Sequence, residues 1–111
     1  MSLSIKSGTG AARVLGLRPE IVIAVLVAND VFQEAGFDCV ITAGIDGSHS
    51  RGSIHYKGLA VDLRARQIPP ADQPKILAKM QERLGGDYDV ILESDHFHVE
   101  FDPKTPINIG A

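Results

Sequence analysis

The stretch Ser53-Ile54-His55-Tyr56-Lys57-Gly58-Leu59-Ala60-Val61-Asp62 places a histidine and an aspartate seven residues apart, with a glycine and an alanine between them. Imidazole nitrogen and carboxylate oxygen are both ligands that zinc takes in proteins. The downstream segment Glu93-Ser94-Asp95-His96-Phe97-His98 adds two histidines and two acids. Together the two segments supply the parts of a catalytic zinc site, which needs three protein ligands, a proton-handling carboxylate and an open position for water.

Two short runs predict strands, one before this first segment and one that overlaps its end. Residues 39–43 form an apolar run bounded by glycines. Residues 59–63 alternate between apolar and polar side chains, and this alternation turns Asp62 away from the apolar face. The residues between the two runs, 44–52, are polar and are expected to form a loop. Asp62 is therefore expected to point toward a site or toward solvent.

The downstream segment belongs to a predicted β-hairpin, with strands at 88–92 and 96–101. In the second strand the apolar residues alternate with His96, His98 and Glu100. Successive side chains of a strand point to opposite faces, so both histidines are expected side by side on the face opposite the core.

Two amphipathic helices are predicted. The first opens at Pro19-Glu20 and ends at Gly36, because proline suits a first helical turn and glycine the residue just past the end. Its apolar stripe consists of Ile21, Val25, Ala28, Phe32 and Ala35. The second follows Asp72, a candidate N-cap, and ends at Leu84 before two glycines. Its buried stripe consists of Ile76, Leu77, Met80 and Leu84.

These elements predict an α+β fold, with a small, mainly antiparallel sheet and the helices packed on one face. The length of 111 residues indicates a single domain over 1–111. Its motif-bearing core covers about 37–101, residues 1–17 are expected to be irregular, and residues 102–111 to form a loosely held tail.

The composition excludes several classes of protein. The net charge of −3 and the absence of a basic stripe argue against a nucleic-acid binder. No apolar run approaches the length of a membrane span, and no export signal is recognised at the N-terminus. The single cysteine, Cys39, excludes an internal disulfide. We expect a monomer.

The pattern Ser53-x-His55-x-x-Gly58-x-Ala60-x-Asp62, followed by a late acid and the pair His96-x-His98, resembles the zinc D-Ala-D-Ala carboxypeptidase family. The family includes related dipeptidases and phage L-alanyl-D-glutamate endolysins, which share a fold with the hedgehog signalling domain. The similarity covers about Ile41 to Phe101, and the order of predicted elements agrees with it. The resemblance implies a hedgehog/DD-peptidase-like fold and a zinc-dependent peptidase. The implied substrate is the peptidoglycan stem peptide, cut at either the D-Ala-D-Ala or the L-Ala-D-Glu bond.

The resemblance also implies roles for individual residues. The zinc ligands would be His55, Asp62 and His98. The family's base is an acid three residues before the last ligand, which is Asp95 here. Strict alternation would put Asp95 on the wrong face, so Glu93 is the rival base. His96 would stabilise the transition state or position the substrate.

Substrate binding departs from the family pattern. Many relatives carry Ser-Gly-Tyr-Arg before the first motif, whereas this chain has Ala43-Gly44-Ile45-Asp46 and lacks the arginine. The family's late Glu-Trp-Trp-His is also missing. Arg51 or His49 could replace the arginine, although both also suit a solvated loop. Ser53 and Tyr56 could orient ligands or line the cleft.

Compact size and the lack of an export signal suit a phage or prophage enzyme, cytoplasmic until released or delivered by a particle to the cell wall. One alternative is a non-catalytic, metal-stabilised wall-binding module, which the missing arginine permits. The other is a cysteine hydrolase using Cys39, although this residue lies in an apolar strand without an activating partner.

Overall fold

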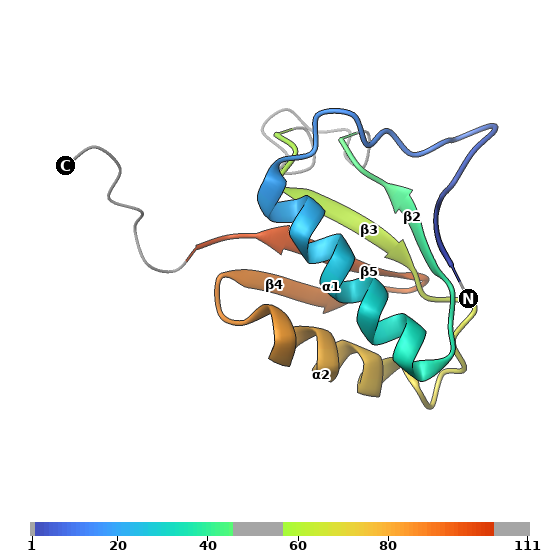
Figure 1. Cartoon of the computed structure of the whole chain (residues 1–111). Coiled ribbons are helices and arrows are strands. Elements are labelled where there is room, and N and C mark those ends of the chain that lie inside the picture. The colour runs from blue at the N-terminus through green and yellow to red at the C-terminus, as the bar shows by residue number, and fades with distance from the viewer. Residues whose placement is uncertain (1, 46–56, 104–111) are drawn as a thin grey trace.

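A computed structural model describes residues 2–45 and 57–103 (Figure 1). Within these residues the strands form one five-stranded sheet in the order β1-β2-β3-β5-β4. Their bounds are β1 (Leu3–Ile5), β2 (Cys39–Ala43), β3 (Ala60–Arg64), β4 (Tyr88–Leu92) and β5 (His96–Phe101). The sheet is mixed, because β1 pairs with β2 in parallel while the other neighbours are antiparallel. The predicted α+β class is confirmed.

Two helices, α1 (Pro19–Ala35) and α2 (Gln73–Leu84), pack against one face of this sheet (Figure 1). Proline at the start of α1 loses no hydrogen bond, because the first N–H groups of a helix have no partner within it. At its end Gly36 adopts a left-handed φ of 89°, and its N–H donates to the carbonyl of Gln33. Neither described helix has the length and apolar character needed to cross a membrane.

The core lies between the helices and the sheet. Phe32 of α1 meets Phe97 of β5 edge-on, with 5.7 Å between ring centroids. Such an aromatic pair adds about 0.5–1.5 kcal/mol beyond the burial of its area. Around it, the largest other fully buried side chains are Ile21, Leu63, Ile68, Met80, Val61, Val99 and Cys39. This packing holds the inner faces of β3 and β5 in place, and therefore fixes the direction of their outward side chains.

The predicted alternation in β3 and β5 is confirmed. Val61 and Val99 are fully buried and face the helices, while Asp62, His96 and His98 are only partly buried and occupy the alternate positions. The observed β3 begins and ends one residue later than the predicted strand at 59–63, without changing which residues share a face.

The prediction that residues 1–17 are irregular is wrong in part, because this segment contains β1. Ser2 accepts a hydrogen bond from the N–H of Cys39, and Lys6 donates its own N–H to the carbonyl of Ile41. All three residues of β1 are exposed, so the strand is held by backbone pairing with β2 and has no burial pattern in the sequence.

Two details of the predicted helices are also corrected. Ala35 is exposed at the end of α1, where the last turn extends beyond the edge of the core. Asp72 immediately precedes α2, but its side chain makes no capping hydrogen bond. Its backbone is already in the α region, whereas a capping side chain needs an extended residue.

Gly58 occupies a sharp bend just before β3. Its φ is 76°, and its carbonyl accepts a hydrogen bond of 2.9 Å from the N–H of Arg18. A Cβ atom at this position would lie 2.4 Å from the carbonyl oxygen of Gly16. Only glycine allows the two backbones to approach this closely, and the contact sets the entry of the chain into β3.

Candidate functional site

The sheet face opposite the helices carries two histidines from β5 beside an aspartate from β3. The antiparallel register places Asp62 directly opposite His98, and Arg64 directly opposite His96. Side chains at directly opposite positions start about 4.5–5.5 Å apart at Cβ, so they interact without further folding of the chain. The strand register therefore assembles the predicted acid and imidazoles.

His98 lies between two carboxylates. Its Nδ1 is 3.0 Å from Oδ1 of Asp62, and its Nε2 is 3.0 Å from Oε1 of Glu100. Ionised carboxylates only accept hydrogen bonds, so an imidazolium that donates from both ring nitrogens satisfies this arrangement. The hydrogen bond to Asp62 is the main reason that the pKa of His98 is raised; Glu100 raises it further, and burial opposes both.

His96 lies on the other side of the same aspartate. Its Nε2 is 3.8 Å from Oδ2 of Asp62 and 3.8 Å from Oε1 of Glu93. Its Nδ1 donates a hydrogen bond of 2.8 Å to Asp95, and this bond holds the pKa of the Asp95 carboxyl below its usual value. The two oxygens of Asp62 thus face two different imidazoles, which makes Asp62 the centre of the cluster.

Asp62 and His98 fit two neighbouring positions of a zinc site. With zinc–ligand bonds of about 2.0–2.1 Å, tetrahedral ligand atoms lie about 3.3 Å apart. The 3.0 Å between Oδ1 and Nδ1 is close to that separation. Nε2 would then keep its proton and donate a hydrogen bond to Glu100, as metal-bound histidines commonly do to a neighbouring carboxylate. Zinc and a proton would compete for Nδ1.

The structure brings together part of the predicted site. Of the three predicted zinc ligands, Asp62 and His98 are in contact, and His55 lies outside the described residues. The predicted substrate-binding residues also lie outside them: His49, Arg51, Ser53 and Tyr56. Both candidate bases lie beside His96. Glu93 is near Nε2, the ring nitrogen that faces Asp62, and Asp95 is near Nδ1 on the opposite side of the ring. The hairpin turn thus brings Asp95 to the histidine face despite strict alternation.

Glu100 is a further member of the cluster; the alternation in β5 predicts its face, but the motif predicts no role for it. Its signal is the spacing of two residues after His98, which brings both to the same face of β5. Asp89, Glu100 and Asp102 also present oxygens within 4.8 Å of one another. A set of carboxylates without nitrogen or sulfur suits hard cations better than zinc, so this trio does not support the predicted metal.

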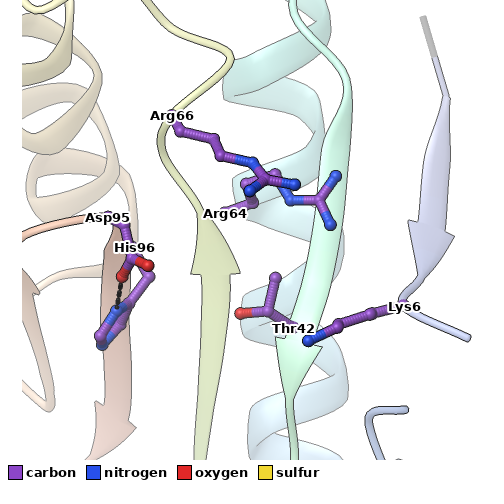
Figure 2. A pocket seen from close by; sticks show the side chains of 6 residues that line it. All are labelled: Lys6, Thr42, Arg64, Arg66, Asp95 and His96. Carbon is purple, nitrogen blue, oxygen red and sulfur yellow. Dashed lines mark hydrogen bonds and ion pairs between the residues drawn. The ribbon is translucent and has the colours of Figure 1, made fainter. Parts of the chain in front are cut away.

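A cleft of about 140 Å³ adjoins His96 (Figure 2). Its lining consists of Lys6, Thr42, Arg64, Arg66, Asp95 and His96. Figure 2 shows the hydrogen-bonded pair of Asp95 and His96 on one side, and the lysine and both arginines grouped toward β2. The local sequence does not predict this cleft, because Lys6 comes from the segment expected to be irregular.

No protein-family model, no curated protein and no solved structure matches this chain. Any assignment of function therefore depends on the motif and on the geometry of the described residues.

Proposed function

We propose that this chain is a zinc-dependent peptidase with a hedgehog/DD-peptidase-like fold, which hydrolyses the D-Ala-D-Ala or L-Ala-D-Glu bond of the peptidoglycan stem peptide. The observation that carries the proposal is the position of Asp62, whose two carboxylate oxygens face His98 and His96. The proposed place of action is the cell wall, reached after release or delivery by a phage particle.

In this proposal the zinc ligands are His55, Asp62 and His98. A zinc ion held there would polarise the scissile carbonyl and activate a water molecule. Asp62 and His98 are fixed by facing strands, and His55 is assigned from its spacing in the motif. Glu100 orients the ring of His98 through Nε2 and so leaves Nδ1 directed at Asp62.

A carboxylate of the hairpin turn handles the proton, taking it from the attacking water and passing it to the leaving amine. Glu93 lies near the nitrogen of His96 that also faces Asp62, whereas Asp95 is hydrogen-bonded to the opposite nitrogen. This geometry favours Glu93 as the base over Asp95. His96, donating from Nε2, would stabilise the negative charge that develops on the carbonyl oxygen.

Zinc content and digestion of purified peptidoglycan test the proposal together. We expect one zinc ion per chain and muropeptide fragments whose masses identify the scissile bond, with cleavage lost on chelation. Bound zinc without any fragments would instead support the wall-binding module. A chain that binds no zinc and cuts peptidoglycan in the presence of a chelator would overturn the proposal.

A further inference from the structure

Three cationic side chains gather in the cleft beside the histidine site. Lys6 follows β1, whereas Arg64 ends β3 and Arg66 lies in the loop directly after it, yet all three line the same space (Figure 2). Among the residues that the structure describes, none of the three forms an ion pair. The acid that shares their cleft, Asp95, is hydrogen-bonded to His96; Arg66 also lowers the pKa of Asp95, but more weakly than His96 does.

Such a grouping needs an explanation, because the chain as a whole carries a net charge of −3. Like charges held together in a concave region repel one another and attract an opposite charge from solution. Arginine presents a planar fork of N–H donors that matches the two oxygens of a carboxylate or phosphate. Arg64 and Lys6 are also partly buried, which limits how far they can separate.

The size of the cleft restricts its occupant. A cavity of about 150 Å³ holds a molecule the size of benzene, and this cleft has a volume of about 140 Å³. One small residue with its carboxylate, or one phosphate group, fits that space. His96 and Asp95 form the boundary with the Asp62 cluster, so an occupant would be continuous with the proposed reaction centre.

We infer that Lys6, Arg64 and Arg66 form a subsite for a compact oxyanion, either a carboxylate or a phosphate. Where the chain is the peptidase proposed above, on which this step rests, the subsite selects peptides that carry a free carboxylate next to the scissile bond. In the related family an arginine before the first motif binds the substrate, and this chain lacks it. The subsite would bind the substrate instead, through residues of β3, the loop after it and the segment after β1.

Amide chemical shifts of the full chain, in chelator and without added zinc, test the subsite directly. The probes are N-acetyl-alanine, its neutral amide N-acetyl-alaninamide, and inorganic phosphate. We expect N-acetyl-alanine to shift the amides of Thr42, Arg64 and Arg66, and the neutral amide to leave them unchanged. Shifts with phosphate alone would keep the oxyanion subsite but assign it to a phosphate. No shift with either anion would overturn it.

Charge-removing variants identify the residues. Arg64→Gln and Arg66→Gln should each raise the dissociation constant of N-acetyl-alanine about tenfold, as expected for one charge-assisted hydrogen bond. Lys75→Gln removes a positive charge from an exposed position of α2, and should leave the constant unchanged. Arg66 is exposed, so Arg66→Gln should fold and still tests the subsite even if Arg64→Gln does not fold. Equal constants for the wild type and both arginine variants would contradict the inference.

The two proposals can fail separately. A chain that binds zinc and cuts peptidoglycan equally fast with Arg66→Gln and Arg64→Gln keeps the peptidase proposal and loses the subsite. A chain that binds no zinc, yet prefers N-acetyl-alanine to its amide, keeps the subsite and loses the peptidase proposal.

Discussion

The carboxylate of Asp62 and the imidazole of His98 face each other across the β3–β5 pairing, with 3.0 Å between Oδ1 and Nδ1. Their side chains are only 13% and 14% exposed, so the sheet and its neighbours determine how they are oriented. A metal site requires ligands held near their final geometry before the ion arrives. This pair meets that requirement without a movement of the backbone.

Zinc should stabilise the folded chain through Asp62. At a free zinc concentration one hundred times the dissociation constant, binding only to the folded state adds about 2.7 kcal/mol. For a domain of this size the melting temperature should rise on the order of 10 °C. Asp62→Asn removes the proposed anionic ligand and should abolish this rise, whereas Asp30→Asn, at an exposed position of α1, should keep it. Equal rises in both variants, followed by calorimetry, would argue against Asp62 as a ligand.

Glu100 should act on zinc affinity through His98. Glu100→Gln keeps the shape of the side chain but removes the charge that holds the Nε2 proton, so the ring becomes a weaker ligand. We expect the zinc dissociation constant to rise about 10–100-fold in competition with a chromophoric chelator. The exposed Glu82→Gln on α2 serves as the charge-matched control. An unchanged affinity in Glu100→Gln would show that the ring needs no such support.

The fold could be predicted wherever periodicity and burial coincide. The alternation in β5 correctly places His96 and His98 on the face away from the helices, and glycine correctly ends α1. β1 could not be predicted, because Leu3–Ile5 is short and exposed and depends on hydrogen bonds to a strand more than thirty residues away. The residues around β1 give no indication that β2 is its partner.

The site could be predicted only in part, for a related reason. The motif predicts that Asp62 and His98 belong to one cluster. It does not predict that they are paired directly across the two strands, because that depends on the register of β3 and β5. Lys6 reaches the cleft only because β1 adds to the sheet beside β2. The positions of these residues depend on how the whole domain packs, and no pattern in the neighbouring sequence predicts them.

The identity of the base can be decided by comparing two isosteric variants. Glu93→Gln should lower kcat for stem-peptide cleavage by about 10²–10⁴-fold and leave the zinc content unchanged, because it removes proton transfer without touching a ligand. Asp95→Asn alters only the partner of His96 at Nδ1 and should have the smaller effect. A larger loss of kcat with Asp95→Asn would assign the base to Asp95. Steady-state kinetics with zinc analysis of each variant makes the distinction.

Gly58 should be intolerant of any side chain. Gly58→Ala places a Cβ against the carbonyl of Gly16 and forces a non-glycine residue into a left-handed conformation. The backbone strain alone costs about 1–3 kcal/mol, and the clash adds to it. Gly86→Ala is the matched control, because no heavy atom lies within 4 Å of its Cβ position. Urea denaturation should therefore separate the two variants; similar unfolding free energies would contradict the close approach.

Cys39 should be unreactive in the folded chain. The side chain is 0% exposed, and burial raises the pKa of its thiol to about 12, from an ordinary value of 9.0. At pH 8 roughly one thiol in ten thousand would be ionised, and the thiolate is the nucleophile. A raised pKa in the folded state means that stability is retained below pH 9.0 and falls as the pH rises from there toward 12. An aromatic disulfide reagent should label the denatured chain fully and the native chain hardly at all. Cys39→Ala should retain the proposed peptidase activity. Rapid native labelling that also abolishes activity would instead support the cysteine hydrolase.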